Sequence, residues 1–237
     1  MFDIKILATG SKGNCYVIED GDSRIMIDPG ISIKEIRKKC NFNLFGLDMC
    51  LVSHEHKDHC KAVKDLMRIG VPLALSAGTL KHFSPNGSLY IILQDGVVWE
   101  RCGWKILPFA VEHDAEEPLG FLIESPSGKK ICYATDTNYM HGVRDNIRYK
   151  YEFSGVTHWM IEANYSEELL QANESLPEDT KSRIRTSHFE INNLMAFFKA
   201  QDLSATEKIY LIHLSDDNSD QAEFIRQIKK VTGKIVV

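Results

Sequence analysis

The feature that most constrains this chain is the segment 54–59 (HEHKDH), in which three histidines and one aspartate crowd together. It directly follows the apolar run 49–53 (MCLVS) and precedes 61–70 (KAVKDLMRIG), whose apolar residues recur at helical spacing. The segment is therefore predicted to form the turn between a buried strand and a helix. Imidazole and carboxylate groups suit zinc and similar first-row ions. This pattern predicts a metal site with the ligands His54, His56, Asp58 and His59.

Four ligands do not complete two hydrolytic metal sites, and the chain offers three more His or Asp residues, each at the end of an apolar run. His113 follows KILPFAV, Asp136 follows KKICYA and a threonine, and His213 ends the run KIYLI. Taken singly, each has another interpretation, as a buried hydrogen-bonded histidine or as an N-cap or turn aspartate. Taken together with segment 54–59, they favour further ligands of one metal centre.

The rest of the chain is predicted to begin with strands joined by tight turns and to continue with strands mixed with helices. Strands are predicted at 3–8, 15–20, 24–28, 49–53, 71–76, 89–93, 97–102, 103–109, 121–125, 129–135, 157–163, 208–215 and 234–237. Helices are predicted at 33–39, 61–70, 166–173, 191–201 and 221–231. The polar segment 173–185 is predicted to be a loop or a partly mobile lid.

Composition limits the class of protein. With 237 residues, 43% of them hydrophobic, the chain can form one large domain, expected to span residues 1–237. A net charge of −5 is not that of a general nucleic-acid binder, so a long polyanion is disfavoured as a ligand. The six cysteines include no C-x-x-C pair, which argues against a thiolate zinc site. No signal-peptide pattern or membrane-spanning run is found, so a soluble, cytoplasmic protein is expected.

The ordered motifs H-x-H-x-D-H, a lone His, a lone Asp and a terminal His resemble the metallo-β-lactamase superfamily over nearly the whole chain. The resemblance implies an α/β fold of the αββα sandwich type, with two mixed β-sheets flanked by helices and the site at one edge. It implies two Zn²⁺ per chain, and Mn²⁺ fits the same nitrogen and oxygen ligands. One ion is implied on His54, His56 and His113. The other is implied on Asp58, His59 and His213, with Asp136 bridging the two.

Two further motifs resemble the phosphodiesterase branches of that superfamily. Asp136 is followed by Thr137, which resembles the G/T-D-T signature of nucleases and phosphodiesterases, whereas lactamases carry a cysteine at that place. The opening GSKGNC resembles the S-G-S-x-G-N loop of small exonuclease-like members, whose glycines let backbone N–H groups approach a phosphate. This implies substrate contacts by Ser11 and Asn14, with an ordinary glycine turn as the alternative.

The resemblance also suggests catalytic residues. Asp58, as a ligand with a second oxygen, is expected to orient the attacking water. The segment IEANYSEELL resembles the H-E-A-T-F segment of transfer-RNA 3′-processing endonucleases, and His188 lies near the place of their proton-donating histidine. His188 is thus implied as the general acid for the leaving alkoxide, although SHFE stands where that family has H-S-T. Glu162 either orients it and contacts substrate or caps a strand end.

The expected substrate is a small phosphodiester, most specifically a cyclic mononucleotide such as cCMP, cUMP or cAMP. Compact phage-encoded members that destroy cyclic-nucleotide immune signals resemble this chain in size and motifs, and the only basic spots noted are short, at 37–39 and 229–230. The alternatives are a metal-dependent DNA exonuclease, a non-catalytic metal-binding sensor, and a thioester or lactam hydrolase. A homodimer is expected, with the apolar run 194–198 (LMAFF) either at the contact or in the core.

Overall fold

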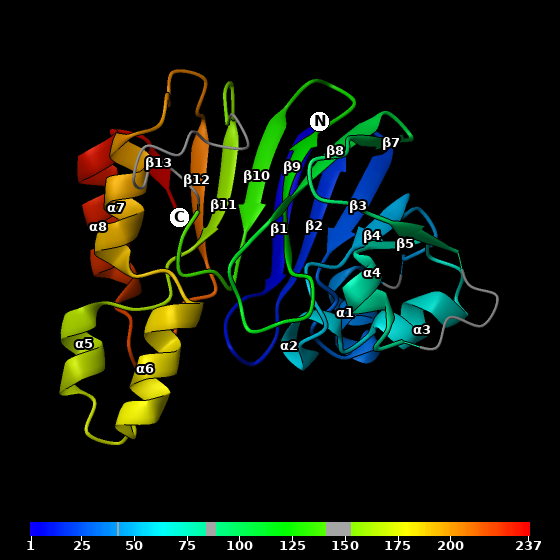
Figure 1. Cartoon of the computed structure of the whole chain (residues 1–237). Coiled ribbons are helices and arrows are strands. Elements are labelled where there is room, and N and C mark those ends of the chain that lie inside the picture. Colours follow the sequence, from blue (N-terminus) through cyan, green and yellow to red (C-terminus); the bar gives the residue numbers. More distant parts are fainter. Residues whose placement is uncertain (42, 84–88, 141–152) are drawn as a thin grey trace. The chain divides into compact units, whose positions relative to one another are not determined.

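The computed structural model describes residues 1–41, 43–83, 89–140 and 153–237 (Figure 1). Its chain divides into two units. Unit 1 consists of Met1–Ala110, Ala115–Leu119 and Glu124–Gly128. Unit 2 consists of Val111–Asp114, Gly120–Ile123 and Lys129–Val237. The expectation of a single domain over 1–237 stays a prediction. Among the described residues, no helix combines the length and the apolar character needed to cross a membrane.

Unit 1 contains a mixed sheet with the strand order β1-β2-β3-β4-β5-β6. Its strands are β1 (Phe2–Ala8), β2 (Cys15–Asp20), β3 (Ser23–Ile27), β4 (Met49–Leu51), β5 (Leu73–Leu75) and β6 (Tyr90–Ile92). The first three pair antiparallel, and β3 to β6 pair parallel. Because parallel strands end at the same edge of a sheet, the residues that follow β3 and β4 meet there, which brings Asp28 next to Ser53.

The described part of unit 1 contains the short helices α1 (Ile33–Lys39), α2 (Lys57–Cys60), α3 (Val63–Arg68) and α4 (Ala77–Leu80). Helix α1 has the predicted bounds, because Ser32 and Glu35 form a reciprocal capping box at its start. The predicted helix 61–70 is shorter in the structure, where α2 ends at Cys60 and α3 begins at Val63. Apolar side chains of these helices, including Ile36, Val63 and Leu66, are fully buried in one cluster with β4 and β5.

The second sheet is also mixed and has the strand order β13-β12-β11-β10-β9-β8-β7. Its strands are β7 (Trp99–Arg101), β8 (Trp104–Ala110), β9 (Leu119–Glu124), β10 (Lys130–Ala134), β11 (His158–Glu162), β12 (Lys208–Ile212) and β13 (Ile235–Val236). Strands β10 to β13 pair parallel within unit 2. The registers Ala134↔Ile161 and Glu162↔Ile212 bring the carboxyl ends of β10, β11 and β12 to one edge.

Unit 2 carries the helices α5 (Glu167–Ala172), α6 (Glu178–Ser187), α7 (Ile191–Lys199) and α8 (Gln221–Thr232). Helices α7 and α8 pack on each other, and α8 contacts β13 (Figure 1). The rings of Phe197 and Phe198 lie 5.8 and 5.6 Å from Trp159. Core packing in unit 2 therefore accounts for the apolar run 194–198, and the homodimer stays a prediction.

Helix α6 corrects the sequence analysis, which predicted 173–185 to be a loop or a lid. The helix lacks an apolar stripe, so periodicity did not reveal it. It begins after Pro177. The negative charges of Glu178 and Asp179 in its first turn interact favourably with the positive N-terminal end of the helix dipole. Arg185 donates hydrogen bonds to Glu167 on α5 (2.8 Å) and to Glu178 (2.9 Å). The side-chain contacts of α6 are therefore mainly ionic rather than apolar.

Candidate metal centre

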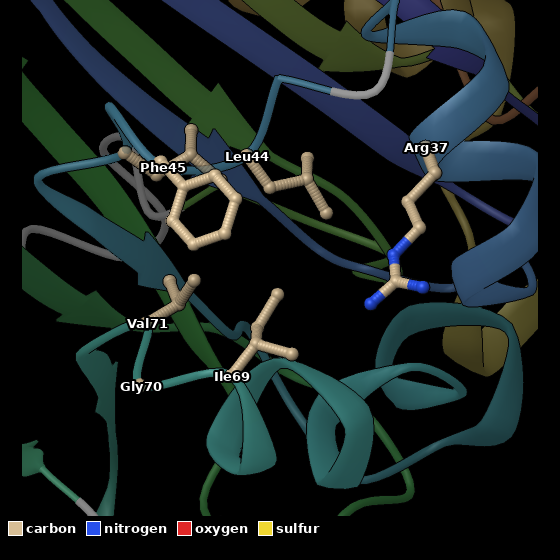
Figure 2. Close-up of a pocket in the computed structure, with 7 residues that line it drawn as sticks. Arg37, Leu44, Phe45, Ile69, Gly70 and Val71 are labelled. Atoms are coloured by element: carbon tan, nitrogen blue, oxygen red, sulfur yellow. The ribbon is translucent and has the colours of Figure 1, made fainter.

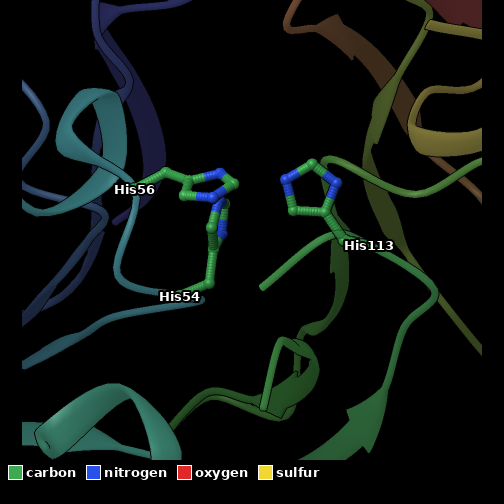
Figure 3. Close-up of side chains that lie close together, drawn as sticks. All are labelled: His54, His56 and His113. Atoms are coloured by element: carbon green, nitrogen blue, oxygen red, sulfur yellow. The ribbon is translucent and has the colours of Figure 1, made fainter. Parts of the chain in front are cut away.

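Half-site 1, defined as His54, His56, Asp58 and His59, lies in unit 1, with His54 and His56 in the loop after β4 and Asp58 and His59 in α2. The ring of His54 lies 4.7 Å from that of His56 and 4.3 Å from that of His59. Figure 3 shows His54 and His56 rising from the same loop. His59 is fully buried, and its Nε2 lies 3.4 Å from Asp58 Oδ2. The four residues predicted from one segment are therefore brought together.

Asp28, which sequence analysis missed, supports half-site 1 through hydrogen bonds to His59 and Ser53. Its buried carboxylate accepts hydrogen bonds from His59 Nδ1 (2.8 Å) and from the amide and hydroxyl of Ser53 (both 2.7 Å). Ser53 Oγ lies in turn 3.0 Å from His54 Nδ1. A carboxylate that holds Nδ1 orients the ring so that Nε2 can serve as a ligand atom. The signal in the sequence was an aspartate at the end of a strand, in MIDPG, which is also what a turn residue looks like.

The glycine-rich loop of the N-terminus packs against half-site 1. Asn14 N donates to the Asp58 carbonyl and Gly30 N to the Asn14 carbonyl, both at 2.7 Å. Gly30 tolerates no side chain, because a Cβ there would lie 1.6 Å from the Asp58 carbonyl oxygen. Asn14 is fully buried, and its amide contacts Gly10 and His59. Asn14 thus supports the loop from inside while Ser11 is exposed, and substrate binding by either stays a prediction.

Half-site 2 belongs to unit 2 and consists of Asp136, Glu162, His188 and His213, each of which has a potential ligand atom within 4.8 Å of the others. Three of them follow or end the parallel strands β10, β11 and β12, and His188 follows α6. Asp136 and His213 have φ values of 46° and 52°, a left-handed conformation that is costly for residues other than glycine. Such local strain concentrates at functional sites.

Glu162 is the centre of half-site 2. Its Oε1 accepts hydrogen bonds from His188 Nδ1 and His213 Nδ1, both at 2.7 Å. Its Oε2 accepts from the amides of Thr137 (3.1 Å) and Phe189 (3.2 Å). The side chain is fully buried, so four donors take the place of water around one carboxylate. Glu162 therefore fixes both imidazole rings and the start of the turn after Asp136.

Electrostatics in half-site 2 favour a protonated His188. Burial raises the pKa of Glu162, but the charge of His188 and hydrogen bonds from His188 and His213 outweigh it and lower that pKa. Burial lowers the pKa of His188, but the charge and hydrogen bond of Glu162, together with Asp136 at 3.3 Å, raise it above its usual value. Because Nδ1 of His188 is bound to Glu162, its Nε2 is the ring atom left for a proton or a ligand.

His113 lies in the part of unit 2 that precedes β9, and its ring centroid is 5.8 Å from that of His188. Its Nε2 lies 3.3 Å from Asp114 Oδ1. The other oxygen of Asp114 lies 3.4 Å from Arg183 Nε on α6. His113, which Figure 3 draws with His54 and His56, thus lies near His188 within unit 2. That it completes the ligand set of His54 and His56 stays a prediction.

The donor atoms of both half-sites are imidazole nitrogens and carboxylate oxygens, which zinc and manganese both accept. A thiolate is not among them. Cys60, which follows half-site 1, donates its thiol to the Glu55 carbonyl (2.9 Å), and burial raises its pKa to about 12. Cys132 is buried inside β10, four residues before Asp136. The residues therefore fit zinc-type ions, as the sequence predicted, without deciding between metals.

Comparisons with known proteins agree with this chemistry. A family model described as "Beta-lactamase superfamily domain" matches residues 23–214. "Exodeoxyribonuclease YycJ" of Bacillus anthracis is 28% identical over 225 residues, which cover 90% of this chain and 83% of that protein. "Exodeoxyribonuclease WalJ" of Streptococcus pneumoniae is 29% identical over 238 residues, which cover 92% and 83%.

A solved structure shares the fold at low identity. The metallo-beta-lactamase fold protein YhfI from Bacillus subtilis superimposes with a TM-score of 0.73 at 13% identity, and the match covers 100% of this chain and 95% of that one. Together with the matched family model, this confirms the predicted αββα class, two mixed sheets flanked by helices.

Proposed function

Because the chain belongs to the metallo-β-lactamase superfamily, we propose that this metallo-hydrolase is an exonuclease that cleaves phosphodiester bonds of DNA. One observation carries the choice of substrate: two relatives named exodeoxyribonucleases align with 90% and 92% of this chain. The net charge had favoured a cyclic mononucleotide instead. None of the relatives reported above is named for such a substrate, so the DNA alternative is now preferred.

The proposal requires half-sites 1 and 2 to act on one phosphate. The family's motifs imply that His113 completes the ligand set of His54 and His56, and that His213 completes the set of Asp58 and His59. Asp136 would belong to both ligand sets, as the family's motifs imply. When bound, two zinc-type ions lower the pKa of a water and stabilise negative charge on the phosphoryl group.

The side chains of this protein perform the remaining steps. Asp58 accepts a hydrogen bond from the attacking water and so aims its oxygen at phosphorus. The new oxygen–phosphorus bond forms as the bond to the leaving sugar oxygen breaks. His188, which Glu162 holds protonated through Nδ1, donates its Nε2 proton to that oxygen, because an alkoxide is a poor leaving group. This need for a proton donor supports a phosphodiester substrate over a thioester or lactam.

The test gives metal-loaded protein end-labelled single-stranded and duplex DNA in parallel with 3′,5′-cyclic CMP and UMP. Release of mononucleotides from DNA ends is the expected result. Turnover of the cyclic nucleotides but not of DNA would favour a cyclic-nucleotide phosphodiesterase. Two bound ions with no turnover of DNA or of cyclic nucleotides would favour a non-catalytic metal-binding sensor.

Asp136→Ala tests the proposed ligand role of Asp136. Loss of the carboxylate should lower metal content and activity together. An unchanged metal stoichiometry in that variant contradicts the proposed bridge.

A further inference from the structure

A surface pocket of about 390 Å³ opens in unit 1 between α1, the loop before β4 and the end of α3 (Figure 2). We call it the Phe45 pocket. Its lining includes Arg37, Leu44, Phe45, Leu47, Ile69 and Val71. The volume lies in the range of small-molecule sites, about 300–1,000 Å³.

The Phe45 pocket combines an apolar floor, an aromatic rim and one cation. Leu44 and Val71 are buried in the floor, whereas Phe45 is 92% exposed. Figure 2 shows the Arg37 side chain reaching from α1 toward the pocket, with its guanidinium group opposite the ring of Phe45. Among the residues that the structure describes, none forms a recorded hydrogen bond or ion pair with Arg37. An occupant with a flat apolar group could cover the exposed ring of Phe45, and a negative charge on the same occupant could pair with Arg37.

We propose that the Phe45 pocket binds one unpaired nucleotide of a DNA strand, with the base against Phe45 and the phosphate on Arg37. The choice of DNA rests on the proposed function. Every base has a π-face that stacks on an aromatic ring, and a guanidinium group pairs with phosphate oxygens in two parallel hydrogen bonds. A concave pocket suits a discrete planar group better than a flat lipid surface.

The surface next to the Phe45 pocket extends its positive charge. A second cavity of about 180 Å³ shares Leu47 with it and is lined by the cations Lys5, Arg24 and Lys39. One anion, Glu19, also lines it and pairs with Lys5 at 2.6 Å. Cations that follow an aromatic platform are what a single strand needs along its phosphate backbone.

The place of the Phe45 pocket in unit 1 predicts that its contribution to binding depends on the length of the DNA strand. Its loop precedes β4, and Val71 precedes β5, so the pocket lies at the amino edge of these parallel strands. Half-site 1 follows their carboxyl edge. Five-residue β3 next to them spans roughly 16 Å at about 3.3 Å per residue, and a strand must be at least that long to reach both places. Short substrates therefore use half-site 1 without touching Phe45.

The experiment measures binding of phosphorothioate oligothymidylates, which resist cleavage, to the full metal-loaded chain by fluorescence anisotropy. A dinucleotide, which is too short to reach from half-site 1 to Phe45, is compared with an oligonucleotide of about 16 nucleotides, the upper end of the usual site sizes on single-strand binders. Phe45→Ala and Arg37→Gln should each weaken binding of the longer one about 10-fold. The shorter one should bind within about twofold of wild type, and hydrolysis of bis(p-nitrophenyl) phosphate should not change.

Matched controls separate this contact from general loss of apolar surface or charge. Leu89→Ala removes another exposed apolar side chain of unit 1, and Lys38→Gln removes the cation next to Arg37 on α1. Both should bind the longer oligonucleotide like wild type. Equal loss in these controls, or wild-type binding by Phe45→Ala and Arg37→Gln, overturns the proposal.

Two further outcomes are informative. If the two pocket variants lose binding to phosphatidylglycerol vesicles but keep DNA binding, the occupant is a lipid surface and the proposal is overturned. Because the binding assay needs no turnover, DNA binding that depends on Phe45 in a protein that does not cleave DNA would support the pocket while refuting the exonuclease.

Discussion

Half-sites 1 and 2 carry similar side chains but are built in opposite ways. Half-site 1 comes from one short segment, 54–59, and is held by neighbours such as Asp28 and the glycine-rich segment. Half-site 2 collects residues from three strand ends and the end of α6, and they meet only because β10, β11 and β12 run parallel in register. The first is a local structure, while the second depends on the whole of its sheet.

This difference predicts where each half-site is vulnerable. In half-site 1, several contacts converge on the loop backbone, so loss of one side chain should reorient a ring without unfolding the loop. In half-site 2, one buried carboxylate contacts two rings and two backbone amides, so its loss affects the fold itself.

Glu162→Ala should have the largest effect, because it leaves four buried donors without their acceptor. Removal of one partner from a buried ionic network costs about 3–5 kcal/mol. The free energy of unfolding, measured with urea on the metal-free protein, should fall by that amount. Glu168→Ala, at an exposed position on α5, is the control and should change stability little. A stability loss no greater than the control's would mean that Glu162 does not organise half-site 2.

His188→Ala should separate catalysis from metal binding within half-site 2. If His188 donates the proton to the leaving oxygen, kcat for DNA should fall about 10²- to 10⁴-fold. A substrate with a p-nitrophenolate leaving group needs less proton donation and should lose much less. The number of bound ions should not change. A parallel fall in metal content and in activity on both substrates would instead make His188 a ligand.

Asp28→Asn tests whether half-site 1 is the more local structure. The variant keeps the shape of the side chain but loses the charge that holds His59 Nδ1. Changes to such supporting residues reduce metal affinity or activity about 10- to 100-fold. Metal affinity measured by competition with a chelator should fall in this range while the melting temperature of the metal-free protein changes less than in Glu162→Ala. A large loss of fold would show that half-site 1 is no more local than half-site 2.

The same contrast explains what the sequence could predict. His54, His56, Asp58 and His59 were visible because local structure leaves a contiguous motif. His113, Asp136 and His213 were found through the apolar runs that precede them, and Glu162 and His188 only through resemblance to a family. Asp28 was missed because a lone aspartate after a strand is the ordinary mark of a turn.

Helix α6 was missed for a different physical reason. Sequence periodicity detects helices that bury an apolar face, and the buried side chains of α6 are those of Lys181 and Ser187. Lys181 reaches across to donate to the Gln171 carbonyl (3.1 Å), and Arg185 pairs with Glu167. These partners lie on another helix, so no window of the sequence around α6 reveals them.

Arg185→Ala tests whether those ionic contacts hold α6, and we expect the smallest effect from it. Exposed ion pairs contribute little to overall stability, so the melting temperature should barely change. Hydrogen exchange of the amides in 178–187 should nevertheless become faster, because the helix loses its links to Glu167 and Glu178. Arg183→Ala on the same helix is the control, since its contact to Asp114 is longer, at 3.4 Å. If exchange in α6 stays as slow as in this control, backbone capping and the anchor of Lys181 suffice to form the helix that carries His188.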